Sequence, residues 1–381
     1  TAVIHGESAY QMKGQLIDEN RQENTIAHEV FHHWFGNLVT TESWSNLAQN
    51  ESFANYSQYL WREYKYGKTD ADAHLFENTK PYLSDPSNHE KKLVRYYYND
   101  KEDMFDLVSY NKGGAILHML RRYLGDDAFF LGLKKYLNTY QYKSAEVSQL
   151  RLALEEVSGK DLQWFFNQWF FGSGHPNIQV SYDYNSLEKT VTVNFVQTQN
   201  NAFKFPMAID IFENGTKKRH HVFVDSRDSS FKFIYESKSP DLVQVNADGV
   251  LLAEFSENKV LSDYIFQLKN ADNYLHKREA LLKVAEKQDQ KQAFNAINEA
   301  LNDDFYKIRI LALEQINLIK GLDLIGIEYT FNEPIGKHKF NWIHDDPAGV
   351  IEASLLDKPV IIGPNIVELP GDLPKIRKKL S

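Results

Sequence analysis

The chain has 381 residues, of which 42% are apolar and 13% aromatic, and this length predicts two to four domains. Its formal net charge of −9 argues against nucleic acid as a partner, because neutralising phosphates requires clustered Lys and Arg. The absence of cysteine excludes disulfides and thiolate ligands, which leaves His and carboxylate side chains for zinc. Neither a run of about 18 apolar residues nor a signal peptide is present, so the sequence predicts no membrane span and no targeting segment.

The first half of the sequence has the pattern of helices. From about Glu19 to Ser173 apolar residues recur at helical spacing, for example in the stretch 115–124. An aromatic helix is predicted from Leu162 to Phe171, and the breaker cluster Gly172-Ser173-Gly174-His175-Pro176 ends it.

Alternating residues after this cluster indicate strands. Ile178, Val180 and Tyr182 alternate with polar neighbours, as do the apolar residues between 191 and 195. Asn214-Gly215 lies between two such runs and has the composition of a tight hairpin turn. We therefore predict a small antiparallel β-sandwich.

The helical period returns after Ser262. Four short antiparallel helices of repeat type are predicted there, at Tyr264 to Leu268, Arg278 to Gln288, Gln292 to Leu301 and Ile308 to Leu318. The predicted fold is therefore multidomain α+β. Its expected parts are a mainly helical domain over 1–173, the β-sandwich over 174–257, a helical repeat segment over 258–320, and an unassigned segment over 321–381.

The pentapeptide His28-Glu29-Val30-Phe31-His32 is the strongest chemical signal. Its two imidazoles stand at i and i+4 and so share one helix face, which suits two positions of a tetrahedral ion. Glu51, on a second predicted helix 19 residues after His32, supplies a third ligand. Two His and one Glu leave the fourth zinc position open, as catalysis requires. Glu29 is then the expected general base for the attacking water.

A bare His-Glu-x-x-His pattern arises by chance on the order of once in a hundred chains of this length. The flanking residues make chance a poor explanation: residues 28–40 read HEVFHHWFGNLVT, and residues 44–54 read WSNLAQNESFA. These blocks resemble the M1 family of zinc aminopeptidases, gluzincins with the motif H-E-x-x-H-x-W-F-G-N-x-V-T and a Glu 19 positions after the second His. Ser52 replaces the usual Gly after that Glu, which is sterically mild.

Two further blocks extend the resemblance to roughly residues 1 to 318. Residues 109–115, SYNKGGA, resemble the family's Y-x-K-G-A stretch, which implies that Tyr110 stabilises the oxyanion. Residues 165–176 resemble the end of the family's catalytic domain, before its β-sandwich. The resemblance implies the helical part of a thermolysin-like zinc catalytic domain over residues 1–173, with one Zn²⁺ per chain.

The sequence departs from the family at its start. Residues 1–7, TAVIHGE, resemble the segment that directly follows the family's G-x-M-E-N motif, which binds the free α-amino group of the substrate. Neither this motif nor the N-terminal domain before it is present, so we expect a fragment of a larger enzyme.

The resemblance implies an aminopeptidase that acts on peptides with a free N-terminus. Three alternatives stay open: a thermolysin-type endopeptidase, which would lack the W-F-G-N and Y-x-K-G blocks; an inactive fragment or scaffold on a peptidase fold; and, more remotely, a lipid epoxide hydrolase.

Overall fold

The computed structural model describes residues 2–18, 20, 22–317 and short strands between residues 327 and 368. The described chain mixes helices and strands, as predicted, and divides into two compact units. The first unit comprises residues 1–5 and 24–260, and the second comprises residues 6–23 and 261–381. Among the described residues, no helix has the length and apolar character needed to cross a bilayer.

Helices predominate in residues 23–169, joined by turns and irregular segments, with one small parallel pair of strands, β1 (Val39–Thr41) and β2 (Lys143–Ala145). Helix α3 packs against α4 and α5, and α6 packs against α7. Gly67 ends α3 with a φ of 89°, a conformation that glycine adopts readily. The helices are α2 (Glu23–Phe31), α3 (Ala48–Tyr66), α4 (Lys68–Ser84), α5 (Gly113–Leu124), α6 (Asp126–Tyr140), α7 (Val147–Ser158) and α8 (Gln163–Trp169), with 3-10 turns η2 (Trp44–Asn46), η3 (Pro86–Asn88) and η4 (Lys101–Met104) and the π-helix η5 (Val108–Lys112).

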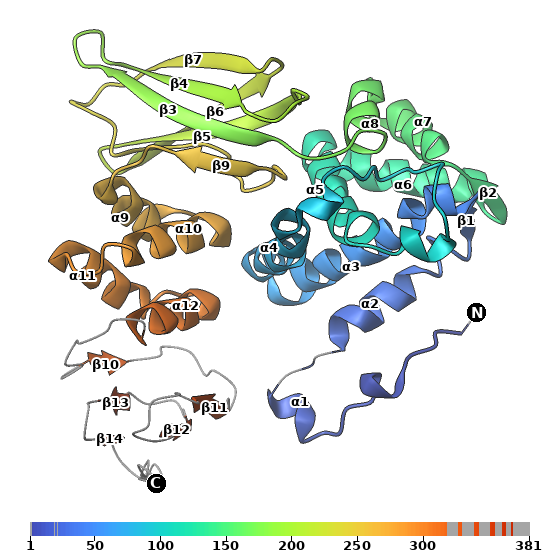
Figure 1. The fold of residues 1–381 in the computed structure, drawn as a ribbon, viewed down its shortest axis with the longest axis horizontal. Coiled ribbons are helices and arrows are strands. Elements are labelled where there is room, and N and C mark those ends of the chain that lie inside the picture. The colour runs from blue at the N-terminus through green and yellow to red at the C-terminus, as the bar shows by residue number, and fades with distance from the viewer. Residues whose placement is uncertain are drawn as a thin grey trace. The chain divides into compact units, whose positions relative to one another are not determined.

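Two sheets follow, drawn as two layers in Figure 1. One has the strand order β7-β4-β3-β9 and the other β6-β5-β8. The expectation of a purely antiparallel sandwich was wrong, because β9 pairs with β3 in parallel. Strand β9 has only four residues. Its direction follows from the path of the chain after β8 and not from a local sequence pattern. The strands are β3 (Asn177–Asn185), β4 (Thr190–Gln197), β5 (Phe205–Glu213), β6 (Thr216–Val224), β7 (Asp228–Ile234), β8 (Leu242–Gln244) and β9 (Glu254–Glu257).

The hairpin between β5 and β6 confirms the predicted turn. Glu213 pairs with Thr216, and Asn214 and Gly215 between them have φ values of 49° and 76°. Positive φ at both central residues is the geometry that favours Asn-Gly, because its twist matches that of the flanking strands.

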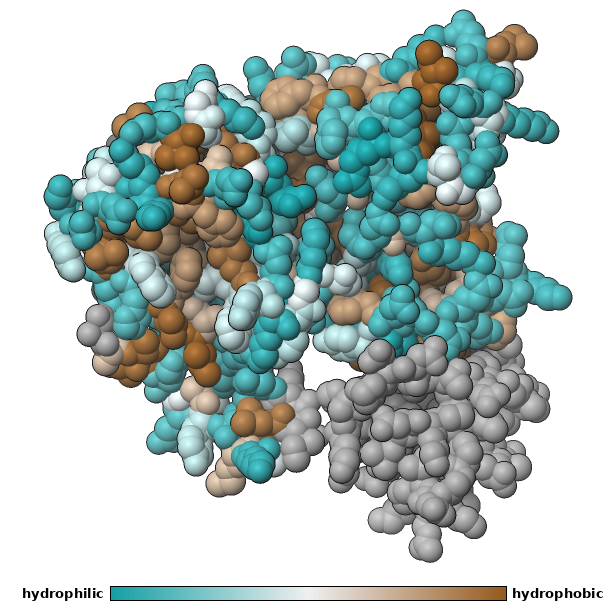
Figure 2. Space-filling view, turned by 180° about the vertical axis from the view of Figure 1, so that it is seen from behind, coloured by the Kyte–Doolittle hydropathy of each residue, from teal (hydrophilic) through white to brown (hydrophobic). Residues whose placement is uncertain are grey.

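One hydrophobic core connects the helices of the first unit with its sheets. Phe166 and Trp169 on α8 belong to this core together with Val193 on β4 and Phe205 on β5. The aromatic helix predicted from Leu162 to Phe171 is therefore present as α8, and burial of its aromatic face attaches the sheets to the helices. On the face drawn in Figure 2, apolar side chains lie among hydrophilic ones over much of the described surface.

The second unit contains the four helices predicted after Ser262. Helix α10 packs against α9, α11 and α12. Asn273 begins α10 by accepting the backbone N–H of His276, which is the reason why this helix starts where it does. The helices are α1 (Gln15–Asp18), α9 (Leu261–Asn270), α10 (Tyr274–Ala285), α11 (Lys291–Ala300) and α12 (Tyr306–Asn317), with the 3-10 turn η1 (Glu7–Ala9).

The segment 321–381 lies outside the described residues except for five short strands. They are β10 (Ile327–Tyr329), β11 (Lys339–Trp342), β12 (Ile351–Ser354), β13 (Val360–Ile362) and β14 (Val367–Glu368).

Candidate metal centre

Two histidines lie at the end of α2. His28 is inside the helix, whereas His32 follows its last residue, Phe31, in a turn. The prediction that one helix carries both is therefore correct only for His28, but the spacing still brings the ring centroids within 4.9 Å. Gly36 closes this turn with a φ of 140°, and a Cβ there would lie 3.1 Å from the carbonyl oxygen of His32. Glycine is therefore required for this close approach.

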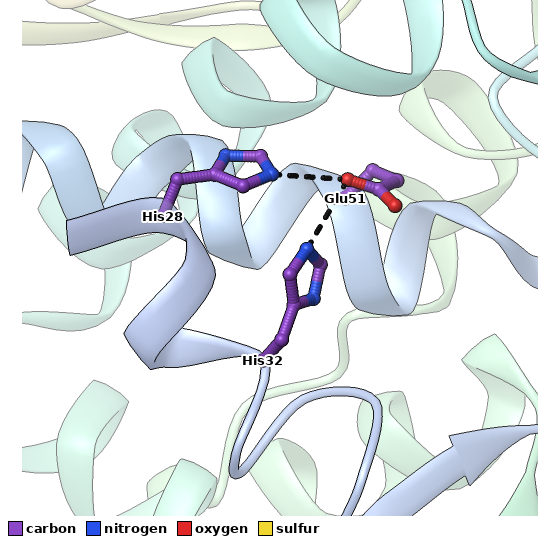
Figure 3. A group of neighbouring side chains, drawn as sticks. All are labelled: His28, His32 and Glu51. Carbon is purple, nitrogen blue, oxygen red and sulfur yellow. Dashed lines mark hydrogen bonds and ion pairs between the residues drawn. The ribbon is translucent and has the colours of Figure 1, made fainter. Parts of the chain in front are cut away.

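Glu51 faces both rings from the first turn of α3. Its Oε2 atom lies 3.2 Å from Nε2 of His28 and 3.5 Å from Nε2 of His32. Figure 3 shows both imidazoles pointing toward the carboxylate. The three ligand atoms lie within 4.8 Å of one another, and they are the one such group of His, Asp and Glu in the described part of the chain.

This geometry fits a zinc ion. Tetrahedral zinc with ligand bonds of about 2.0–2.2 Å separates neighbouring ligand atoms by about 3.3–3.5 Å. The two distances from Glu51 to the histidines, 3.2 and 3.5 Å, match that separation. Two imidazoles and one carboxylate are also a donor set that zinc accepts.

The outer nitrogen of each ring has a partner. His32 donates its Nδ1–H to the carbonyl oxygen of Phe35 at 3.1 Å, and its Nε2 atom faces Glu51. The side-chain amide of Gln58, two turns along α3 from Glu51, lies 3.3 Å from Nδ1 of His28. Its amide oxygen lies 3.2 Å from Nε2 of His74 on α4. Such partners of the outer nitrogens fix ring orientation at metal sites.

The charges of the three side chains support one another. Burial opposes ionisation of Glu51, but hydrogen bonds from His28 and His32 outweigh it and lower the pKa of Glu51 to about 2. Burial alone would lower the pKa of His32, yet the adjacent Glu51 carboxylate raises it above its ordinary value. Glu51 is therefore a carboxylate at neutral pH, the state in which it can bind a cation.

Tyr110 and Glu29 lie beside this group. The ring of Tyr110 stacks on His28 with centroids 5.8 Å apart. Burial, and then the negative charge of Glu51, raises the pKa of Tyr110 well above its ordinary value, so the phenol stays protonated and can donate a hydrogen bond. Glu29 is half-buried, and its charge also raises the pKa of both Tyr110 and His32. All five residues predicted from the sequence are thus near one another.

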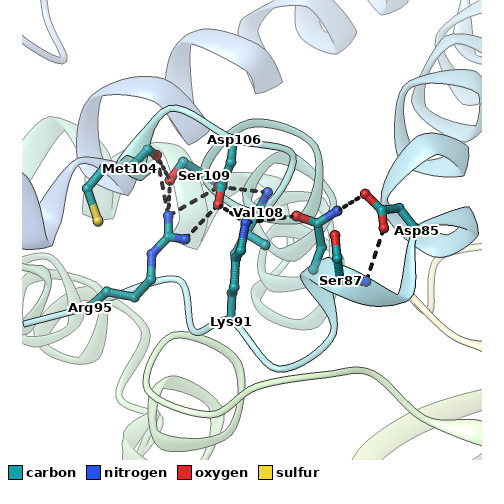
Figure 4. A network of polar contacts seen from close by, with 9 residues as sticks. Asp85, Ser87, Lys91, Arg95, Met104, Asp106, Val108 and Ser109 are labelled. Carbon is teal, nitrogen blue, oxygen red and sulfur yellow. Dashed lines mark hydrogen bonds and ion pairs between the residues drawn. The ribbon is translucent and has the colours of Figure 1, made fainter. Parts of the chain in front are cut away.

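A half-buried ion pair holds the segment that carries Tyr110. Asp106 accepts hydrogen bonds from Arg95 Nη1 at 2.6 Å and Nη2 at 3.1 Å (Figure 4). The same carboxylate accepts the backbone N–H groups of Val108 and Ser109 at 3.1 and 3.0 Å, where η5 begins. Tyr110 is the next residue, in the middle of this π-helix. Single π-helical turns occur frequently at functional sites.

Close packing joins Tyr110's segment to the helix of Glu51. Ser52 donates its hydroxyl to the carbonyl oxygen of Ser109 at 2.7 Å. A Cβ on Gly113 would lie 1.9 Å from the Ser52 hydroxyl oxygen, and one on Gly114 would lie 2.5 Å from Oδ1 of Asn55. The two glycines therefore allow α5 to approach α3. Ser52, which stands where family M1 usually has Gly, also joins the two segments through its hydroxyl.

Sequence reasoning missed Gln58, Arg95 and Asp106. Gln58 could have been found from its spacing, because a residue seven positions after Glu51 lies on nearly the same helix face. Arg95 and Asp106 are 11 residues apart in irregular segments, and no periodic pattern indicates that they meet.

Comparison with known families matches residues 9–169 to the peptidase family M1 domain. The sequence is 32% identical over 214 residues to tricorn protease-interacting factor F2 of Thermoplasma acidophilum, covering 55% of this chain and 27% of that protein. It is 35% identical over 178 residues to aminopeptidase N of Lactococcus lactis, covering 42% of this chain and 20% of that protein. The chain therefore spans about a quarter of the length of these curated relatives.

A solved structure has the same fold over most of the chain. The crystal structure of Legionella pneumophila aminopeptidase A in complex with aspartic acid matches with a TM-score of 0.65 at 19% identity. The match covers 80% of this chain and 37% of that chain. Over residues 9–169, the chain described here is thus similar to peptidase family M1.

Proposed function

We propose that this chain is the zinc-binding part of an aminopeptidase, which hydrolyses the N-terminal bond of peptides that have a free N-terminus. The convergence of His28, His32 and Glu51 within 4.8 Å, in a domain similar to peptidase family M1, carries this proposal. Named relatives among the aminopeptidases support the choice of reaction.

His28, His32 and Glu51 would hold one Zn²⁺. When bound, this ion supplies a Lewis acid that polarises the substrate carbonyl and acidifies a water molecule. The open side of the three ligands leaves space for that chemistry.

Glu29 takes a proton from the attacking water and passes it to the departing amine. Tyr110 donates its hydroxyl to the carbonyl oxygen, on which negative charge develops during attack. The raised pKa of Tyr110 supports this role, because a deprotonated phenol could not donate.

Zinc content and turnover test the proposal together. We expect about one zinc per chain by atomic emission, lost in Glu51→Ala, with cleavage of aminoacyl amides and none of N-blocked peptides. Glu29→Gln should keep the zinc and lower kcat by roughly 10²–10⁴-fold, the contribution typical of general acid–base catalysis. The exposed carboxyl of Glu42 offers a matched control, and Glu42→Gln should change neither quantity.

Each of the other possible results would favour one alternative function or contradict the metal assignment. Cleavage of blocked peptides would indicate a thermolysin-type endopeptidase. Zinc without turnover would mean an inactive piece or scaffold, and a chain that binds no zinc would contradict the metal assignment itself.

A further inference from the structure

A cavity of about 300 Å³ lies among α5, α8 and the sheet of β5 and β6, within the first unit. None of the residues of the metal centre lines it. This volume is at the lower end of the range for sites that hold small organic molecules, about 300–1,000 Å³. The peptidase chemistry proposed above makes no use of this cavity.

Many of the residues that line the cavity are aromatic or apolar, and the rest are polar or charged. Tyr123 of α5 and Trp164 of α8 meet edge to face there, with ring centroids 5.7 Å apart. Met119, Phe205 and Met207 also line it and are buried. Such walls favour a ligand with a flat apolar body, which would gain both burial and ring contacts.

Trp169, which also lines the cavity, has an unused hydrogen-bond donor. Its side chain is fully buried, and its indole N–H finds no acceptor within the described residues. A buried N–H without an acceptor is costly, and most buried indoles have one. A ligand oxygen in the cavity would supply the acceptor that the protein lacks.

Lys204 also lines the cavity, and its backbone is held next to α8. Lys204 is tied to α8 by Gln168, which donates to its carbonyl oxygen at 2.8 Å and accepts its backbone N–H at 2.7 Å. Gln168 directly precedes Trp169, and Phe203 contacts the Trp169 ring at 5.0 Å. In the part of the chain that the structure describes, the exposed Lys204 ammonium makes no hydrogen bond or ion pair, so it is available to an anion.

The other charges on the cavity wall favour a single negative charge on the ligand. Arg219 is matched by Asp210 through two hydrogen bonds of 2.7 Å. Arg122 is a second exposed cation on the wall, and its charge also contributes to the lowered pKa of Asp126. Asp248 is the carboxylate on the wall, and it disfavours a more highly charged anion.

We propose that this cavity binds a small organic carboxylate with an aromatic body. Its carboxylate would lie between the Lys204 ammonium and the Trp169 N–H, with the ring against Tyr123 and Trp164. Two charge-assisted hydrogen bonds, one from the ammonium and one from the indole N–H, give the carboxylate its advantage over uncharged analogues.

Three probes with the same ring test the charge requirement. Phenylacetate, phenylacetamide and phenethylamine are titrated calorimetrically into the full chain carrying Glu51→Ala with chelator present, so that no carboxylate can bind at the metal centre. We expect one site, at which phenylacetate binds at least about tenfold more tightly than the amide or the amine, the factor typical of one charge-assisted hydrogen bond. Equal binding of the three probes, or no binding of phenylacetate at 20 mM (roughly the weakest affinity that calorimetry follows), would overturn the proposal.

Variants locate the binding. Lys204→Gln should remove most of the preference for phenylacetate, whereas Lys238→Gln, an exposed lysine of the same unit outside the cavity, should keep it. Val250→Trp should fill the cavity and abolish binding. Unchanged binding in both Lys204→Gln and Val250→Trp would assign the titration to another site. Because the zinc ligand Glu51 is already removed, these outcomes do not depend on the peptidase proposal.

Discussion

Removing the charge of Asp106 should weaken both the fold and the position of Tyr110. In Asp106→Asn the side chain keeps one oxygen for the backbone N–H groups of Val108 and Ser109, but its new amide group faces the Arg95 guanidinium. Arg95 is then a cation with 12% of its side chain exposed and no carboxylate beside it. Charge-assisted hydrogen bonds contribute about 1.5–3 kcal/mol each, and breaking a mostly buried pair costs more than breaking an exposed one.

We therefore expect the free energy of unfolding to fall by about 3 kcal/mol. A domain of this size loses roughly 2–4 °C of Tm per kcal/mol, so the expected shift is roughly 6–12 °C at pH 7. Thermal unfolding followed by circular dichroism measures it. Asp127→Asn, which removes an exposed carboxyl from α6, is the matched control and should shift Tm little.

The effect should also depend on pH with a defined sign. Burial would raise the pKa of Asp106, but Arg95 and the other donors hold it below its ordinary value. A lowered folded-state pKa contributes stability that is fully present above about pH 4, the ordinary Asp pKa, and is lost as pH falls through the lowered value. The difference between wild type and Asp106→Asn should therefore narrow at low pH. A Tm shift equal to that of Asp127→Asn, or a gap that stays constant down to pH 3, would refute this reasoning.

Three further predictions concern packing, the hairpin and the metal. Gly113→Ala should destabilise the chain by at least about 2 kcal/mol, because the new Cβ meets the Ser52 hydroxyl oxygen at 1.9 Å, and chemical denaturation measures this. Asn214→Ala should cost about 1 kcal/mol because of its φ of 49°, whereas Asn214→Gly should be nearly neutral by the same measurement. Removing metal with a chelator should lower the Tm of wild type by several degrees and leave Glu51→Ala unchanged.

Each of these predictions has its own control. The double variant Gly113→Ala with Ser52→Gly should lose less stability than the sum of the two single variants, since the clash disappears; additivity would contradict the packing argument. Equal losses for Asn214→Ala and Asn214→Gly would show that backbone conformation is not the cause. A chelator effect of the same size in Glu51→Ala would place the metal elsewhere.

The sequence predicted best those features that depend on local pattern. Helical periodicity and the Asn214-Gly215 dipeptide each describe neighbouring residues, and the corresponding elements are present. The group of His28, His32 and Glu51 could be predicted because two ligands are one turn apart and the third lies in a motif of fixed spacing.

Long-range features could not be predicted in this way. The parallel pairing of β9 with β3 joins residues about 77 positions apart, as in Asn177 with Glu254. The contact of Ser52 with Ser109 and the pair of Arg95 with Asp106 depend on how separate segments pack. These contacts become visible only once the core has positioned the helices.

The π-helix η5 has a consequence for how this segment tolerates change. A π-turn contains one residue more than an α-turn, so deleting Asn111 or Lys112 would let the segment rewind as a regular α-helix. Every side chain before the deletion would then rotate by about 100° relative to α5. Tyr110 would leave the ring of His28, on which it now stacks, even though its identity and the three metal ligands were unchanged. The extra residue of the π-helix thus sets the rotation that places the Tyr110 phenol beside the histidines. Helix α5, which follows it, stays regular.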